Sequence, residues 1–423
     1  MSDHGPIVWI AGTSWDGVAG TDRCIVEALA RLCPVLWVDP PTRPSLKKAR
    51  LALRGRRKAR VADGPAGLER VSDSILRLRV TVLPGVTRPG IRRVTAVMLD
   101  RAITSALSRA GWEPEAVVVA MPMARFPQKA PGCKILYLTD DWLEGSRLMG
   151  LSRSVIRRVL DSNLAQADGV AAVSEALLTR FQPLNPSASG KAFAVIPNGC
   201  LEPAETAPAH RESTACLVGQ LNERLDLDLL EAVQASGVEM VLIGPRADRT
   251  PAFARRLDTL LEAGNVRWMG RLETGELHQE LSVHGVGLTP YAESAFNRAS
   301  FPLKTLEYLA AGLGVVSTDM PSARWLDTSL ISLQSEPAAF ARAVKAALAR
   351  RNDRDQERLR KDFAAGHTWG ARALEFQQLL AAASHLSCPP ATVAGGNPVH
   401  HRPQLGDPTP VAAAQDPLPE GTS

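Results

Sequence analysis

One segment of the chain combines residue types that could bind a nucleotide. Residues 297–318 read NRASFPLKTLEYLAAGLGVVST, in which Pro302 suits the first turn of a helix. The free backbone N–H groups of such a first turn favour an anion such as a diphosphate. The candidate donor-binding residues of this turn are Ser300, Phe301, Pro302 and Leu303, of which all but Pro302 have a backbone N–H. Lys304 adds a positive charge there, and Glu307 follows at a spacing that shares the same helix face.

Glu307 suits the sugar of a nucleotide because a carboxylate accepts two hydrogen bonds, as vicinal ribose hydroxyls require. We expect Gly312 to end this helix. The alternative is an amphipathic helix with a surface Lys–Glu pair, which the spacing alone predicts equally well.

Two other sets of polar residues follow predicted strands in the first half of the chain. The strand Ile7–Ala11 runs into a glycine-rich turn that could approach donor phosphates or an acceptor, or could be a purely structural turn. Its candidate residues are Gly12, Trp15, Asp16 and Gly17. The strand Lys134–Leu138 is followed by Asp140 and Asp141, of which either could orient an acceptor hydroxyl or act as a base. The alternative is that one of them caps the next segment.

The elements that position these residues follow a strand–helix alternation, which is typical of parallel sheets. Further strands are predicted at 35–38, 116–120, 169–173, 192–196, 215–218, 240–243, 266–269, 285–289 and 315–317. The fold class is therefore α/β, with two doubly wound, Rossmann-like domains facing across a cleft. We expect a first domain over 1–200, a linker over 201–214, a second domain over 215–383 with its last helix near 370–382, and a disordered tail over 384–423.

Length and composition agree with this organisation. The 423 residues exceed one ordinary core, and 45% apolar with 22% charged residues is typical of a globular protein. No apolar run reaches the roughly 18 residues of a membrane span, and the N-terminus lacks a secretory pattern. Six scattered cysteines without a CxxC pair predict no zinc site and fit a reducing cytoplasm. We expect neither a metal nor a cofactor.

Six motifs in chain order resemble those of GT-B glycosyltransferases, in the large retaining group that uses nucleotide-sugars (glycosyl transferases group 1). The resemblance covers roughly residues 5–382, and the agreement of the motifs in order is a far stronger indication than any one of them. They are ADGVAAVSE at 167–175, VIPNG at 195–199, LVGQLNER at 217–224, NVRWMG at 265–270, PLKTLEYLAAGLGVVSTDMP at 302–321 and HTW at 367–369. In this fold the last helix crosses back to the first domain.

The resemblance implies roles for single residues. Glu307 would bind ribose, while Lys304 and the amides of 300–303 would bind diphosphate. Arg224, after the turn at Gly219, would neutralise the departing diphosphate, a step that in this fold normally needs no metal. The base would be held near Gly244, Arg246 and Arg271. For each arginine the alternative is a solvated surface charge.

The chain also departs from the family pattern. The retaining group usually has a second Glu eight residues before the ribose Glu, where this chain has Ala299. Glu293 or Asn297 could serve the donor sugar instead. After the helix the chain reads GLGVV, where the family usually has Lys-Pro before the valines. The donor and the stereochemical outcome therefore stay open.

The positive charge is concentrated in one stretch. Residues 1–200 carry a net +11 and residues 201–423 a net −6, and nine of the basic residues lie between Arg43 and Arg60 without any acid. A helix over this stretch would suit an anionic membrane surface, and the alternative is a solvated loop. Nucleic acid is not expected as a partner, because no aromatic residues are interleaved.

These observations predict a cytoplasmic glycosyltransferase that moves a sugar from a nucleotide-sugar to a hydroxyl acceptor. The acceptor could be a lipid-linked or polysaccharide precursor, and the enzyme could lie peripherally on the inner face of the membrane. Two alternatives share the architecture: a nucleotide-sugar 2-epimerase, and a nucleotide-binding partner protein without activity.

Overall fold

The computed structural model describes residues 4–17, 19–42, 66–82, 89–183, 185–204, 210–301 and 303–387. The basic stretch 43–60, Pro302 and the residues after 387 lie outside the described residues. The described residues form one compact unit that contains two β-sheets.

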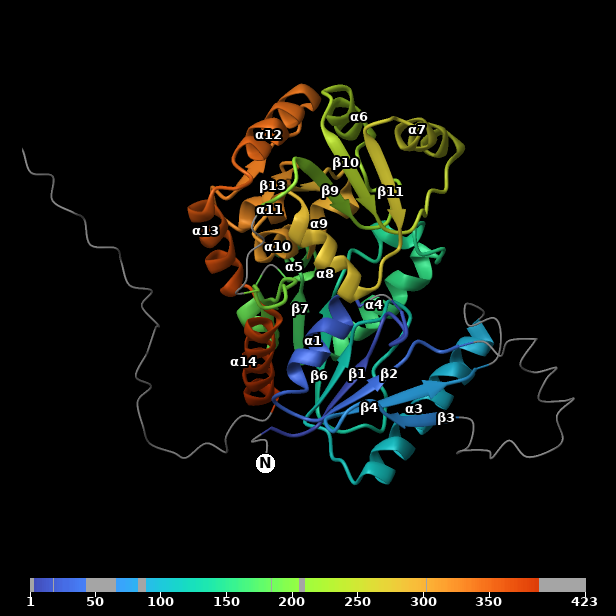
Figure 1. Ribbon diagram of the computed structural model, residues 1–423. Coiled ribbons are helices and arrows are strands. Elements are labelled where there is room, and N and C mark those ends of the chain that lie inside the picture. The colour runs from blue at the N-terminus through green and yellow to red at the C-terminus, as the bar shows by residue number, and fades with distance from the viewer. Residues whose placement is uncertain are drawn as a thin grey trace, which may run out of the picture. The chain divides into compact units, whose positions relative to one another are not determined.

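The first sheet has eight strands in the order β3-β4-β2-β1-β5-β6-β7-β8 (Figure 1). Only β3 runs antiparallel to its neighbour, so the other seven strands, β4 included, end at one edge of the sheet. The strands are β1 (Ile7–Ile10), β2 (Val35–Val38), β3 (Ala66–Arg70), β4 (Ile75–Val80), β5 (Ala116–Val119), β6 (Cys133–Leu138), β7 (Gly169–Ala172) and β8 (Ala192–Val195). The helices are α1 (Thr21–Leu29), α3 (Pro89–Ala110), η1 (Glu144–Ser146), α4 (Arg153–Gln166), α5 (Glu175–Phe181) and η2 (Pro186–Ser189).

The second sheet has six parallel strands in the order β11-β10-β9-β12-β13-β14. The strands are β9 (Thr214–Val218), β10 (Glu239–Ile243), β11 (Val266–Gly270), β12 (Val286–Thr289), β13 (Gly314–Ser317) and β14 (Ile331–Leu333). The helices are α6 (Leu227–Ala235), α7 (Pro251–Leu261), α8 (Thr274–Val283), α9 (Ala295–Ala299), α10 (Leu303–Ala310), α11 (Pro321–Trp325), α12 (Pro337–Ala349), α13 (Arg354–Ala365) and α14 (Trp369–Ser387).

Both faces of the second sheet are covered, as a parallel sheet requires. Successive residues of a strand point to opposite faces, and on β9 Ala215 and Leu217 belong to one apolar cluster while Cys216 and Val218 belong to the other. Helices α6 and α12 pack over the first face and α10 over the second. The central strands are therefore mainly apolar, which is the pattern that reveals them in the sequence, whereas the edge strand β11 carries the exposed Arg267 and Trp268.

The predicted fold class is confirmed, and most predicted strands agree with the structure to within one residue. The sequence patterns predicted no element between residues 61 and 115, where the structure has β3, β4 and α3, and they did not predict β14. They also ended the last helix too early. Helix α14 continues to Ser387, so residues 384–387, which we expected in the tail, are helical.

Helix α14 packs against the first sheet although it follows the second in sequence. It contacts α1, β6, β7 and β8. The ring of Phe376 lies 5.4 Å from that of Trp9 and 5.8 Å from that of Tyr137, in the buried core. Across the described ranges, we find no helix with the length and apolar character that crossing a bilayer demands.

Helix α10 lies directly on β12 because Gly287 leaves room for Tyr308. A Cβ at Gly287 would lie 2.2 Å from Cγ of Tyr308, whose hydroxyl accepts a hydrogen bond of 2.7 Å from the backbone N–H of Val218. We expect Gly287→Ala to lower the free energy of unfolding by about 1–3 kcal/mol through overpacking, as measured by urea denaturation.

The matched control is Gly314→Ala on the neighbouring strand. Its Cβ would lie 3.4 Å from the nearest atom, an ordinary contact, so unfolding should change little. Equal losses for the two variants would contradict the role given to Tyr308.

Candidate active site

The start of α10 is tied to the strand ends of the first sheet by two buried hydrogen bonds. Ser174, which follows β7, donates from Oγ to the carbonyl of Ala299 over 2.6 Å and also caps α5. Asn198, after β8, donates from Nδ2 to the carbonyl of Phe301 over 2.9 Å. Both side chains are nearly inaccessible. Sequence analysis found both residues in motifs but missed this use of them, which a pattern along the chain does not reveal.

A pocket of about 230 Å³ lies where these strand ends meet the start of α10. Its polar lining comes from both sheets: Thr21, Thr139, Asp140, Asn198, Gly219, Arg224, Ser300 and Lys304 are among the lining residues. The structure thus brings together Asp140, Arg224 and Lys304, which lie far apart in the sequence.

Arg224 is held rigidly in this pocket. Its guanidinium lies over the rings of Tyr291 and Phe296, at 5.4 and 4.9 Å from their centroids, and its Nε donates to Oδ1 of Asn297 over 3.0 Å. Within the described part of the chain, its two terminal nitrogens have no hydrogen-bond partner. A stacked guanidinium with free terminal nitrogens can bind a phosphate in bidentate fashion.

Lys304 and Glu307 form an ion pair on one face of α10. Lys304 Nζ lies 2.6 Å from Oε2 of Glu307, and each side chain is 21% exposed. Lys304 lines the pocket, and its first-turn position adds charge to the free N–H groups of the helix start. The pair agrees with the plain Lys–Glu interpretation, and the nucleotide-binding role of both residues stays a prediction.

The two neighbouring aspartates have different surroundings. Asp141 is fully buried, accepts from the backbone N–H groups of Leu143 and Glu144, and pairs with Arg180. This is the capping alternative, and it leaves Asp141 no part in the pocket lining. Asp140 lines the pocket, with Oδ1 3.5 Å from Oγ of Ser300. Burial raises the pKa of Asp140, which the positive charge of Arg224 opposes.

Two glycine turns bring the backbone close to this pocket. Gly219 has φ of +154° and Gly244 has φ of +143°, a region that disfavours other residues. A Cβ on Gly244 would lie only 1.9 Å from the carbonyl oxygen of Gly219, so the two turns pack backbone to backbone. Gly219 lines the pocket, while the described lining does not include Gly244.

Five other predicted donor-binding residues also lie outside the described lining, and one of them is Glu307. Asn297 is buried, and its amide donates to the carbonyls of Arg224 and Ala292 while its oxygen accepts from Arg224. It therefore positions Arg224. Glu293 pairs with Arg298 at the surface. Arg246 pairs with two aspartates, and Arg271 is exposed.

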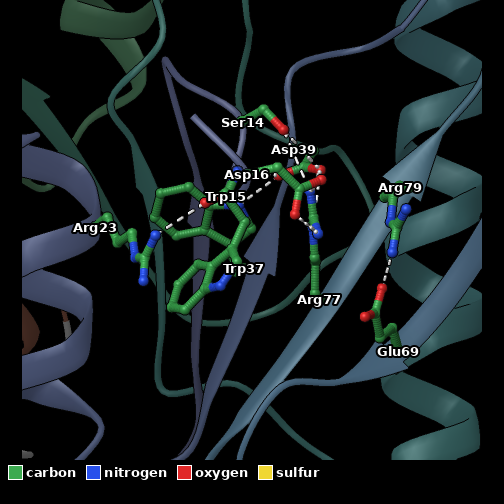
Figure 2. Close-up of polar contacts among 9 residues, drawn as sticks. All are labelled: Ser14, Trp15, Asp16, Arg23, Trp37, Asp39, Glu69, Arg77 and Arg79. Carbon is green, nitrogen blue, oxygen red and sulfur yellow. Dashed lines mark hydrogen bonds and ion pairs between the residues drawn. The ribbon is translucent and has the colours of Figure 1, made fainter. Parts of the chain in front are cut away.

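The predicted acceptor loop is held by a buried cluster that sequence analysis missed (Figure 2). Arg77 on β4 donates from Nε and Nη2 to Asp39, at 2.9 and 2.7 Å, and both side chains are almost inaccessible. Arg77 also binds both carboxylate oxygens of Asp16, whose side chain is 70% exposed. Asp39 accepts in addition from the backbone of Trp15 and the indole of Trp37.

This cluster gives the loop a structural explanation. Trp15 is core, 5.1 Å from the ring of Trp37, rather than an exposed stacking surface. Gly12 and Gly17 are required by close contacts, because a Cβ would lie 2.9 Å from the carbonyl of Ala120 and 3.0 Å from that of Ser14. Of the four candidates, Gly12 and Asp16 are exposed, and only Asp16 has a polar side chain. The described lining of the pocket includes none of the four predicted loop residues.

Asp22, in the first turn of α1, is a buried acid near this site that sequence analysis also missed. Its Oδ2 accepts from the backbone N–H of Gly12 over 2.7 Å, and its Oδ1 has no partner among the described residues. Burial raises the pKa of Asp22 to about 7, and the charge of Asp140 adds to the effect. No cluster of three or more His, Cys, Asp or Glu suited to a metal ion occurs in the described residues.

We expect Arg77→Gln to lower the free energy of unfolding by about 3–5 kcal/mol, because it leaves Asp39 buried without its counter-charge. The matched control is Asp16→Asn, which removes only the exposed partner and should cost about 0–1 kcal/mol. Denaturant unfolding of both variants checks this, and equal losses would show that the buried pair does not anchor the loop.

The raised pKa of Asp22 predicts a pH dependence of stability. Between about pH 4 and 7 the folded protein keeps a proton that the unfolded chain releases, so this group destabilises the fold increasingly as pH rises. Asp22→Asn should therefore match the parent near pH 4 and exceed its unfolding free energy above pH 7 by up to about 4 kcal/mol.

Unfolding curves at several pH values measure this gain. Asp161→Asn, at an exposed position on α4, is the control and should show no such trend. A pH-independent difference between Asp22→Asn and the parent would contradict the raised pKa.

Comparisons with known proteins agree with this geometry. Residues 213–350 match the family described as Glycosyl transferases group 1. Over 157 residues the chain is 28% identical to the Bacillus subtilis (strain 168) protein TuaH, which bears the name of a teichuronic acid biosynthesis glycosyltransferase. This match covers 36% of the chain and only 39% of the length of that relative.

Solved structures extend the similarity to nearly the whole chain. Sucrose-phosphate synthase from Thermosynechococcus elongatus has a TM-score of 0.64 at 17% identity, covering 89% of this chain and 98% of that one. The UDP-forming trehalose-phosphate synthase from Burkholderia xenovorans, in complex with glucose-6-phosphate, has a TM-score of 0.62 at 13% identity, covering 89% and 100%. An E. coli structure bound with UDP-2-fluoro glucose has a TM-score of 0.61 at 12% identity, covering 89% and 99%.

At these identities the solved structures establish the fold alone, and the family match rests on the second sheet and its helices. The expected resemblance is confirmed: residues 213–350 are similar to glycosyl transferases group 1, and nearly the whole chain has the GT-B fold of the solved structures named above.

Proposed function

We propose that this protein transfers a sugar from a nucleoside diphosphate sugar to a hydroxyl acceptor. The observation that carries the proposal is the stacked Arg224, whose terminal nitrogens are unpaired within the described chain, in one pocket with Lys304 and Asp140. Two cations and the free N–H groups of a helix start suit a diphosphate. Asp140, which follows a strand of the other sheet, lies in the same pocket and could orient an acceptor hydroxyl.

In this reaction the bond from the anomeric carbon to the diphosphate breaks, and a bond from that carbon to the acceptor oxygen forms. The leaving nucleoside diphosphate gains negative charge, which Arg224 stabilises without moving because it is already stacked and held at Nε. Lys304 adds a second positive charge. Glu307 would bind the ribose once the ligand draws Lys304 to the phosphates. Asp140 orients the acceptor hydroxyl, and its raised pKa suits it to take the proton that this oxygen loses.

The positive charge of these side chains supports a transfer step that needs no metal ion. The acceptor that we propose is a lipid-linked or polysaccharide precursor, and the name of the Bacillus relative supports a polysaccharide. The basic stretch 43–60 supports peripheral binding to an anionic membrane surface. An acceptor-independent epimerase is disfavoured because the relatives named above are transferases and synthases.

The donor site predicts distinct effects for two substitutions. Glu307→Ala should weaken binding of the preferred nucleotide-sugar about 10- to 100-fold, since hydrogen bonds to a charged group are lost. Arg224→Gln should lower kcat about 10²- to 10³-fold with a smaller change in KM, and Arg224→Lys should restore part of the loss. Calorimetric titration with a panel of nucleotide-sugars, followed by turnover with and without EDTA, measures both.

The matched controls are Glu262→Ala and Arg255→Gln, at exposed positions of the second half that do not line the pocket. Both should stay within twofold of the parent. A folded protein that binds no nucleotide-sugar would overturn the proposed function, and loss of turnover in EDTA would overturn its metal independence.

A further inference from the structure

A second and larger hollow lies beside α3 in the first sheet's half of the protein. It measures about 840 Å³, within the range of pockets that hold small organic ligands. Its apolar lining includes Val97, Leu99, Met121, Met123 and Phe126. Val97 is 50% exposed although it is apolar, so this surface is not covered by the described chain.

The rim of this groove is basic. Arg92, Arg93 and Arg125 line it, and none of the three has a hydrogen bond or ion pair among the described residues. Asp100 is the only acid in the described lining, and its Oδ1 accepts from the backbone N–H of Lys129. An apolar floor with an unpaired cationic rim is complementary to a ligand that carries both a hydrocarbon chain and a negative charge.

The topology of the sheet determines where the basic rim and the apolar floor lie along the groove. Because β4 runs parallel to β2, α3 begins at the edge where the strands end and descends along the sheet beside β4 (Figure 1). Arg92 and Arg93 therefore lie near that edge, and Leu99 lies about 10 Å further down the helix axis. The charged end of a ligand would face the strand ends, and its hydrocarbon chain would run away from them.

Asp140, the carboxylate that we propose orients the acceptor hydroxyl, lies at the same edge of the sheet. Met121 follows β5, and the register Val119 opposite Leu136 places it beside the end of β6, two residues before Asp140. At the usual strand spacing this end of the groove is on the order of 10 Å from Asp140. The groove and the pocket thus meet the same strand ends.

We propose that this groove binds the hydrocarbon chain of a lipid-linked acceptor, with Arg92, Arg93 and Arg125 binding its phosphate. The inference rests on the proposed function and names the acceptor class for it. The chain's own basic stretch 43–60 is a poorer occupant, because the arginine rim would repel it.

Binding of alkyl phosphates to the full chain, below their micelle concentrations, tests the proposal. Octyl, decyl and dodecyl phosphate should bind with affinity rising about two- to fourfold per added methylene. Inorganic phosphate and the uncharged dodecyl maltoside should bind at least tenfold more weakly than dodecyl phosphate. Affinity that does not depend on chain length, or no binding at all, would overturn the proposal.

Variants on α3 locate the binding. Val97→Asp, and the double substitution Arg92→Gln with Arg93→Gln, should each weaken dodecyl phosphate binding at least tenfold. The controls are Val94→Asp and Arg101→Gln, exposed positions of the same helix outside the lining, which should stay within twofold. Equal effects of test and control variants, at unchanged thermal melting, would overturn the assignment to this groove.

Two further measurements distinguish a lipid ligand from the chain's own basic stretch, and a failure of the groove proposal from a failure of the proposed function. A variant with residues 43–60 replaced by a Gly/Ser linker should bind dodecyl phosphate within threefold of the parent, and a gain above tenfold would show that this segment is the occupant. Nucleotide-sugar binding is measured on the same samples. Donor binding without alkyl phosphate binding overturns the groove alone, and the reverse overturns the proposed function.

Discussion

Two buried hydrogen bonds between side chains and backbone carbonyls are the contacts on which the site depends. Ser174 and Asn198 come from the strand ends of the first sheet, and the carbonyls of Ala299 and Phe301 come from the segment that leads into α10. An unsatisfied buried carbonyl costs free energy, so this segment is fixed to the first sheet as well as to its own. The same contacts set the distance between Lys304 and Asp140, and thereby the pocket between them.

A second feature of the site is that Arg224 is held in position before any ligand binds. Arg224 is stacked on two rings and held at Nε, so it needs little rearrangement to receive an anion. Asn297 has its side-chain amide engaged in supporting that loop. In the first sheet, by contrast, the charge of Arg77 is neutralised by ion pairs with Asp39 and Asp16. Arg224 in a turn and Arg77 on β4 thus have opposite uses, because of the two only Arg77 has carboxylates of the described chain within ion-pair distance.

Most of the fold could be predicted from the sequence, and so could the candidates Asp140, Arg224 and Lys304, which the structure brings together in one pocket. The central strands are short apolar runs that end at glycine or polar residues, and such runs are visible without a structure. The region from 66 to 110 was missed because β3 and β4 carry charged residues such as Glu69 and Arg77 among the apolar ones, and α3 leaves valines exposed. An edge hairpin and a helix beside an open groove lack the continuous apolar signal of a buried element.

The sequence by itself determined the α/β alternation, the order of the motifs and the candidates Arg224, Lys304 and Glu307, because each depends on residues close together along the chain. Only the tertiary structure decided which strand-end carboxylate is free. Asp140 and Asp141 are neighbours in the sequence. Asp141 accepts hydrogen bonds from backbone N–H groups and pairs with Arg180, whereas Asp140 lines the pocket. Partners at such separations are fixed by how the chain folds back on itself, which no local spacing encodes.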